Sequence, residues 1–142
     1  LRVDGLPLIK PPYGQIVALD LNEGEILWDV VHGETPDYIR NHPALAGIDI
    51  APTGQAGRVG LLTTKTMVIA GDGGSYTNAD GEQEALLRAY DKLTGEQLGS
   101  LPMPAQQTGS PMTYAINGVQ YLAVSISGGD VAGRLRVYSY EP

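Results

Sequence analysis

Short apolar runs alternate along the chain with breaks rich in glycine and proline, and no stretch keeps the period of an amphipathic helix. Residues 15–21 and 25–31 alternate apolar and polar side chains on either side of a turn, as the two strands of a hairpin do. The remaining strand-like runs are equally short: 59–64, 66–70, 86–90, 97–101, 110–115, 119–125 and 134–140. The pattern predicts an all-β fold, with at most a helical turn in 38–45.

The turn of the first hairpin carries a motif that occurs twice. Asp20 can accept hydrogen bonds from backbone N–H groups two residues on, and Gly24 suits a turn position with positive φ. Trp28, the only tryptophan, follows four residues later. The pattern Ala-x-Asp-x-x-x-Gly-Glu returns at 89–96, 71 positions later (89 − 18), with Gly99 in the place of the tryptophan. A repeated strand–turn–strand unit indicates a β-repeat architecture.

The motif Ala-x-Asp-x-x-x-Gly-x-x-x-Trp of residues 18–28 resembles the tryptophan-docking motif of the pyrroloquinoline-quinone (PQQ) dehydrogenases, the quinoprotein alcohol and glucose dehydrogenases. Three further stretches resemble the C-terminal third of that family: Lys10-Pro11-Pro12-Tyr13-Gly14, residues 54–66, and residues 109–114 with 118–121. The resemblance implies an eight-bladed β-propeller in which each docking tryptophan packs between adjacent blades.

The length is too short for a closed propeller. One blade takes roughly 40–50 residues, so the 142 residues can form about two to three blades. The resemblance places part of a blade in 1–32, a long loop in 33–57, a blade in 58–102 and the last blade in 103–142. The last blade then lacks its outer strand, as expected if the N-terminal strand of a longer protein closes the ring. The absence of an initial Met agrees with this interpretation.

Composition excludes several classes of function. The net charge is −7 and the acidic residues are scattered, so the chain offers no surface for a nucleic acid. The absence of cysteine excludes disulfides, thiolate catalysis and cysteine metal sites within the chain. No apolar run approaches the 18 or so residues of a membrane-spanning helix.

The resemblance also implies a cofactor. Family members bind PQQ above a Ca²⁺ ion at the mouth of the central channel and oxidise alcohols or sugars by base-assisted hydride transfer. PQQ carries carboxylates and quinone oxygens, so its site needs cationic donors. Lys10 is the candidate cofactor-binding residue, because its motif resembles the cofactor-side basic residue of glucose-type members. An ordinary surface lysine fits the sequence equally well. The expected propeller would bring Lys10, the 33–57 loop and Asp72 together at that mouth.

Other polar residues are weaker candidates. His32 and His42 are ten positions apart, a poor metal signature, and loop or interface roles are favoured. Asp37, Asp49 and Asp72 are candidate general bases. The catalytic Asp of the family and its Ca²⁺ ligands match nothing in this chain and are expected upstream. We therefore assign no catalytic and no metal-binding residue, and the chain alone is predicted to be inactive.

Three hypotheses follow. The first is the C-terminal part of a periplasmic PQQ-dependent dehydrogenase for a glucose-like sugar or an alcohol, with any membrane attachment supplied by upstream parts. Its partners would be the remaining blades, and open blade edges would favour self-association. The second is a non-catalytic propeller that acts as a scaffold for protein partners. The third is an independent small β-sandwich that serves as a binding module.

Overall fold

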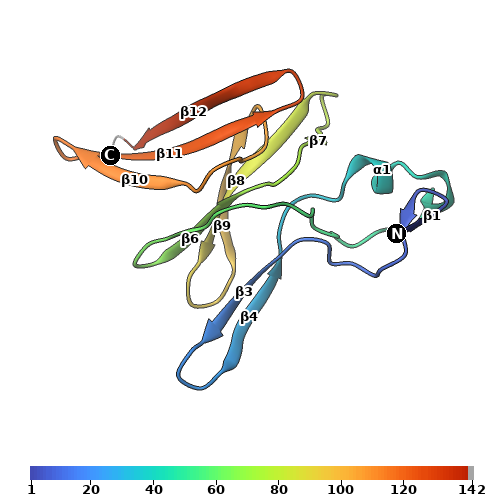
Figure 1. Ribbon diagram of the computed structural model, residues 1–142, viewed down its shortest axis with the longest axis horizontal. Coiled ribbons are helices and arrows are strands. Elements are labelled where there is room, and N and C mark those ends of the chain that lie inside the picture. The colour runs from blue at the N-terminus through green and yellow to red at the C-terminus, as the bar shows by residue number, and fades with distance from the viewer. Residues whose placement is uncertain (141–142) are drawn as a thin grey trace.

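The computed structural model describes residues 1–140, and its regular secondary structure is almost entirely β-strand (Figure 1). Two short helical segments, α1 (Asp37–Arg40) and the 3₁₀ helix η1 (Pro43–Leu45), interrupt the long loop after the first hairpin. The strands are β1 (Arg2–Val3), β2 (Leu6–Pro7), β3 (Gln15–Asp20), β4 (Glu25–Val31), β5 (Leu62–Thr63), β6 (Met67–Gly71), β7 (Tyr76–Thr77), β8 (Gln83–Asp91), β9 (Gln97–Met103), β10 (Met112–Ile116), β11 (Val119–Gly128) and β12 (Val131–Tyr140). The all-β prediction is confirmed.

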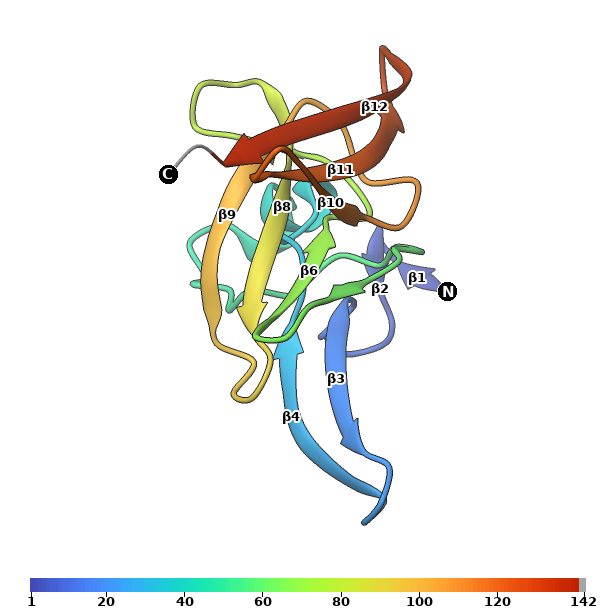
Figure 2. The same ribbon diagram turned by 90° about the vertical axis from the view of Figure 1, so that its left-hand side faces the viewer.

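After a small two-stranded sheet of β1 and β2, three antiparallel sheets follow one another along the chain. The first is the hairpin β3–β4, the second has the order β5-β6-β8-β9 with β7 also paired to β8, and the third has the order β10-β11-β12. Figures 1 and 2 both show the second sheet between the hairpin and the third sheet. We call its contact with the hairpin and residues 32–34 the first sheet interface, and its contact with the third sheet the second sheet interface.

The two repeats of the turn motif have the same structure. The side chain of Asp20 accepts hydrogen bonds from the N–H groups of the residues two and three positions on, and the side chain of Asp91 does the same. Gly24 and Gly95 have φ values of 73° and 76°, and the N–H of each donates to the carbonyl of its aspartate. Both hairpins also have a register shift just before the turn, which extends the repeat to the strand pairing.

Trp28 lies at the first sheet interface. Its indole Nε1 donates a hydrogen bond to the carbonyl of Lys92 at 3.0 Å, and a Cβ on Gly95 would lie 2.7 Å from its ring. The tryptophan of one repeat therefore packs on the glycine turn of the next. The expected docking contact between adjacent sheets is confirmed, and the β-sandwich hypothesis is wrong.

Several element boundaries differ from the prediction. The loop expected over 75–84 contains β7, which pairs with the start of β8 across a turn in which Asn78 Oδ1 accepts hydrogen bonds from two backbone N–H groups. The strand expected over 59–64 is shorter than predicted and comprises β5 alone. Residues 57–60 pack against Gly73 and Ser110 instead of pairing with a neighbouring strand. The helical turn expected in 38–45 occurs as α1 and η1.

Two apolar clusters form the core. The smaller one, at the first sheet interface, consists of Ile16, Val68, Ala70 and Tyr90, with Trp28 and Val30 packed against it. The larger one spans the second sheet interface and consists of Ile69, Ala85, Leu87, Met103, Ala105, Val124 and Ile126. None of the helices described in residues 1–140 is long and apolar enough to cross a membrane.

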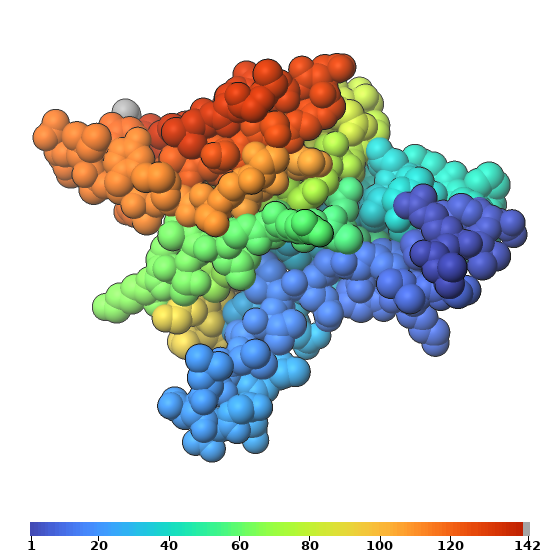
Figure 3. Space-filling view, viewed as in Figure 1, coloured from blue at the N-terminus to red at the C-terminus, as the bar shows by residue number. Residues whose placement is uncertain are grey.

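Loops gather at one end of the strands. In Figure 1 the N-terminal residues, α1 and the connection around β7 lie toward the right, whereas the turn between β3 and β4 points away from them at the lower left. We call the first of these regions the loop end. The space-filling view shows the β3–β4 hairpin projecting from the rest of the molecule (Figure 3). Apolar side chains on it are exposed, among them Leu19 and Ile26.

Candidate functional site

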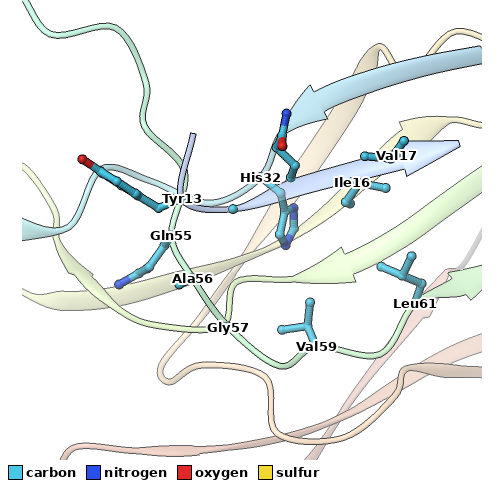
Figure 4. Close-up of a pocket in the computed structure, with 12 residues that line it drawn as sticks. Tyr13, Ile16, Val17, His32, Gln55, Ala56, Gly57, Val59 and Leu61 are labelled. Atoms are coloured by element: carbon cyan, nitrogen blue, oxygen red, sulfur yellow. The ribbon is translucent and has the colours of Figure 1, made fainter. Parts of the chain in front are cut away.

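A cavity of about 360 Å³ opens at the loop end, beside the first sheet interface. The start of β3 forms one wall and residues 55–61 form another, with His32 between them (Figure 4). Ile16 and Val59 give it an apolar part, and Gln15 and Gln55 supply neutral amides. Among residues 1–140, no acidic side chain, lysine or arginine lines this cavity.

Glycines allow four backbone segments to meet around the cavity. A Cβ on Gly14 would overlap the carbonyl oxygens of His32 and Gln55, and a Cβ on Gly57 would overlap the backbone of Gly73. Backbone hydrogen bonds link three of these segments, from Tyr13 N to the carbonyl of Thr53 and from Gln55 N to the carbonyl of His32. The segment that precedes β5 is therefore fixed in place against the ends of the strands.

His32 is buried between the hairpin and the second sheet. Its Nε2 lies 3.1 Å from the carbonyl oxygen of Gly71, which can only accept, so Nε2 carries the proton. Its Nδ1 then accepts from the hydroxyl of Tyr90 at 2.8 Å. Burial lowers the pKa of His32, and burial raises the pKa of Tyr90 to about 12. A neutral imidazole and a protonated phenol fit this pair. His32 is thus an interface histidine, the role that the sequence favoured.

A buried ion pair lies next to His32. Asp72 is fully buried, and its two carboxylate oxygens accept hydrogen bonds from Arg88 Nε at 2.8 Å and Arg88 Nη2 at 3.2 Å. Arg88 Nη2 also donates to Glu34 at 2.9 Å, across the first sheet interface. Burial alone would lower the pKa of Arg88, but its hydrogen bonds and the charge of Asp72 raise it.

This pairing decides the role of Asp72. Its carboxylate accepts the two bonds from Arg88 and a third from the N–H of Leu86, so it is enclosed by protein groups. The expectation that Asp72 faces the channel mouth together with Lys10, as a candidate base, is wrong. The aspartate holds an arginine that ties the loop after β4 to the second sheet.

The 33–57 loop is fixed to the second sheet at another point as well. Asp37 accepts hydrogen bonds from the N–H and the hydroxyl of Thr77, at 2.9 Å and 2.6 Å. Desolvation would raise the pKa of Asp37, but the hydrogen bonds from Thr77 and the charge of Arg40 lower it overall. Arg40 also pairs with Glu34 at 3.6 Å. Asp37 is therefore an ionised anchor of the loop.

Lys10 and the remaining candidates lie apart from the cavity wall. Lys10 is exposed in the connection between β2 and β3, and within residues 1–140 its ammonium makes no hydrogen bond or ion pair. His42 accepts a hydrogen bond from Ala44 N, which caps η1, and its Nε2 lies 2.7 Å from the carbonyl of Asp4. Asp49 is exposed. The structure leaves Lys10 available to a ligand.

Sequence reasoning missed the partners in this network. Arg88 stands at an inward-facing position of β8, between apolar neighbours, and an aspartate directly follows β6. A charged residue inside an apolar run was the signal of a buried ion pair. Gln55 carried no comparable signal, although its Oε1 is buried without a hydrogen-bond partner among the described residues.

The donors in the described chain suit only part of the expected cofactor. The free ammonium of Lys10 fits a carboxylate or quinone oxygen of PQQ. Neutral amides and backbone groups around the cavity could add hydrogen bonds. A Ca²⁺ ion needs six to eight oxygen ligands, several of them carboxylates. Within residues 1–140 no three acidic or histidine side chains gather closely enough to hold a metal ion, so these residues do not fit a calcium site.

Successive antiparallel sheets linked by a docked tryptophan define a segment of a β-propeller. Residues 1–122 match the family model for the β-propeller domain of glucose, ethanol and alcohol dehydrogenases that use PQQ. The chain belongs to this family of quinoprotein dehydrogenases, as its motifs predicted.

Individual relatives support the same family assignment. The chain is 29% identical over 124 residues to quinoprotein glucose dehydrogenase A of Acinetobacter calcoaceticus, a match that covers 87% of the chain and 14% of that protein. It is 32% identical over 130 residues to a probable quinate dehydrogenase (quinone) of Xanthomonas campestris pv. juglandis, covering 87% and 15%. For the glycerol dehydrogenase large subunit of Gluconobacter thailandicus the identity is 32% over 125 residues, covering 87% and 16%.

The chain therefore spans about one-seventh of the length of these relatives. No solved structure matches it.

Proposed function

We propose that this chain is the C-terminal part of a PQQ-dependent dehydrogenase that oxidises a glucose-like sugar or another alcohol by hydride transfer to the quinone. The observation that carries the proposal is the family match over residues 1–122. The docking of Trp28 on the next repeat supports the propeller arrangement that such an enzyme needs. In this proposal residues 58–102 form one blade, 103–142 the last blade and 1–32 part of an earlier one, with 33–57 as the long loop.

Lys10 is the cofactor-binding residue of the proposal. PQQ, when bound, supplies the acceptor for two electrons and a proton. Lys10 would hold one of its carboxylates or quinone oxygens, since its ammonium is exposed at the loop end and unpaired within residues 1–140. The anchored 33–57 loop would shape the neighbouring surface, through Asp37 on Thr77 and Glu34 on Arg88.

The other requirements of the reaction belong to the rest of the protein. The Ca²⁺ ligands and the catalytic base are assigned to upstream blades, as the family resemblance implies. The proposed compartment is the periplasm, with any membrane attachment supplied by upstream parts. The remaining blades are the proposed partners, and the open hairpin and sheet edges would favour self-association of the chain when it is alone.

The proposed substrates form a broad class, because the relatives are named for glucose, quinate, glycerol and 1-butanol. Each of these compounds carries a hydroxyl group. We therefore propose a sugar or alcohol substrate and select a panel of aldoses, polyols and primary alcohols for the assay.

The direct test uses the complete protein. The apoprotein is titrated with PQQ in the presence of Ca²⁺, binding is followed by fluorescence quenching, and dye reduction is measured across the substrate panel. Saturable binding with activity on at least one sugar or alcohol is expected. A folded complete protein that neither binds PQQ nor reduces the dye would contradict the proposal and favour the scaffold alternative.

Lys10 has its own test. Lys10→Ala should weaken PQQ binding at least tenfold, because a hydrogen bond to a charged group contributes roughly 1.5–3 kcal/mol. Lys65→Ala is the matched control, since Lys65 is an exposed lysine in the turn between β5 and β6. Equal PQQ affinity of the Lys10→Ala variant and the wild type would show that Lys10 is an ordinary surface lysine.

A further inference from the structure

Lys10 lies on a short exposed segment, residues 8–12, which we call the Lys10 strap. The C-terminal end of the strap is fixed by the N–H of Tyr13, which donates to the carbonyl of the buried Thr53 at 2.7 Å. Two prolines follow Lys10 directly and restrict its backbone. One end of the strap is thus attached to the 33–57 loop, and the place of the ammonium depends on what holds the other end.

A small hairpin leads into the N-terminal end of the strap. Its strands β1 and β2 pair at two positions, and a two-stranded hairpin alone is marginally stable in water. The hairpin therefore needs support from the rest of the chain. Figure 1 shows the N-terminal residues beside α1, where the guanidinium carbon of Arg2 lies 4.3 Å from the centre of the Tyr38 ring. Both side chains are exposed, so this cation–π contact contributes little.

His42 supplies a hydrogen bond that ties this hairpin to the 33–57 loop. Its Nε2 lies 2.7 Å from the carbonyl oxygen of Asp4, in the turn between β1 and β2. A carbonyl oxygen can only accept, so Nε2 carries the proton. Nδ1 is then the acceptor for the N–H of Ala44, 3.2 Å away. The two ring nitrogens therefore have separate roles: Nε2 holds the hairpin, and Nδ1 caps η1.

We infer that His42 is a positioning residue for Lys10. By holding the β1–β2 hairpin on the 33–57 loop, its bond to Asp4 sets where the Lys10 ammonium lies, and so raises the affinity for an anionic cofactor. The inference rests on the proposed function, in which Lys10 binds a carboxylate or quinone oxygen of PQQ. A strap that is fixed before binding improves affinity, because less conformational freedom is lost when the cofactor binds. His42 acts through Lys10 and not on the cofactor itself.

Two conservative substitutions in the complete protein separate the roles of the ring nitrogens. His42→Gln places an amide nitrogen close to the position of Nε2 and keeps a donor for the carbonyl of Asp4. His42→Asn places an oxygen close to the position of Nδ1 and keeps the cap of η1, since asparagine is a favourable N-cap residue. Its side chain is shorter, so it loses the bond to Asp4. His42→Asn should weaken PQQ binding about fivefold, as expected for the loss of one neutral hydrogen bond, whereas His42→Gln should bind PQQ like the wild type.

A double-mutant cycle tests whether His42 acts through Lys10. In the Lys10→Ala background, His42→Asn should have no further effect on PQQ affinity, because the group that His42 positions is absent. Asn41→Gln, at the exposed neighbouring position, is the matched control and should leave the affinity unchanged. Equal PQQ affinities of the His42→Asn and wild-type proteins would overturn the inference. So would a loss of affinity that is the same with and without Lys10.

A measurement without cofactor separates this inference from the proposed function. In the complete apoprotein, amide hydrogen exchange of residues 2–9 should be faster in the His42→Asn variant than in the wild type, and as slow as the wild type in the His42→Gln variant. Equal exchange in all three proteins would overturn the inference, whatever the PQQ titration shows. If exchange depends on His42 but Lys10→Ala binds PQQ as tightly as the wild type, the proposed cofactor role of Lys10 is refuted, and the attachment of the strap by His42 is not.

Discussion

The first sheet interface combines a small apolar cluster with specific polar contacts, whereas the second depends on a larger apolar cluster. At the first, Trp28 donates to a carbonyl of the next turn, His32 bonds to Tyr90, and Glu34 pairs with Arg88. At the second, Val124 and Ile126 are completely buried. Fewer polar side chains cross it. The buried Gln107, which bridges to Ile126, accepts a hydrogen bond from the N–H of Gly71, and the half-buried Tyr138 donates to the carbonyl of Pro102.

The difference shows two ways of joining adjacent sheets. Directional bonds fix the position of the loop after β4 relative to the second sheet, because each bond requires one geometry. An apolar cluster holds the sheets together through area and shape, with less control over loops. The polar interface is the one beside the loop-end cavity, where the proposed cofactor would need fixed surroundings.

The largest predicted effect tests the polar network at the first interface. Arg88→Met should destabilise the complete protein by about 3–5 kcal/mol, because it leaves Asp72 buried without a counterion. Thermal and urea denaturation measure the loss of stability. Arg134→Met is the control, because Arg134 is an exposed arginine. The double variant Asp72→Leu/Arg88→Met should recover part of the lost stability, because it removes the unpaired carboxylate as well. If the double variant is as unstable as the sum of both single variants, the ion pair is not the cause.

The next effect concerns the tryptophan plug. Trp28→Ala should cost about 2–4 kcal/mol, toward the low end of losses for buried aromatic residues because Trp28 is only partly buried. Leu27→Ala, on the neighbouring exposed side chain, should cost less than about 0.5 kcal/mol. PQQ affinity should change less than stability does. Unchanged melting of the Trp28→Ala variant would show that this contact does not hold the first interface together.

Substituting the two turn glycines distinguishes the stability cost of disturbing the docking contact from the cost of backbone strain. Gly24→Ala and Gly95→Ala both place alanine at positive φ, which costs about 1–2 kcal/mol. A Cβ at position 24 meets nothing within 4 Å, whereas one at 95 meets the ring of Trp28. Gly95→Ala should therefore cost more, and the excess should disappear in the Trp28→Ala background. If the extra cost of Gly95→Ala persists in the Trp28→Ala background, its cause is not the contact with the indole.

Much of the fold could be predicted because its signals are local. The Asp-to-Gly turns need particular residue types at fixed spacing, and both form as the motif indicates. Asn-Gly is a dipeptide typical of tight hairpin turns, and Asn117-Gly118 forms the turn between β10 and β11 with positive φ at both residues. The docking of Trp28 followed from the family motif.

The site was less predictable because its contacts join residues far apart in sequence. Arg88 meets Glu34 across 54 positions and His32 meets Tyr90 across 58, distances over which residue spacing carries no information. Asp72 could be taken for a channel-facing base because nothing in the sequence shows which way its carboxylate points. The role of Lys10 stays a prediction, since it depends on a cofactor that other blades must also contact.

The smallest predicted effect is a pH dependence that belongs to the first interface alone. Burial lowers the pKa of His32 in the folded protein relative to about 6.5 in the unfolded chain. As the pH falls below about 6.5, the unfolded state binds a proton that the folded state resists, so stability should decrease until the lower folded pKa is reached. Each unit of pKa difference contributes at most about 1.4 kcal/mol. The measurement compares the free energy of unfolding at pH 8 and at pH 5.5. The His32→Gln variant should be less stable than the wild type at pH 8, and its stability should decline less between the two pH values. His42→Gln, a histidine outside both interfaces, should retain the wild-type decline; an equal slope in the His32→Gln and wild-type proteins would remove His32 as its source.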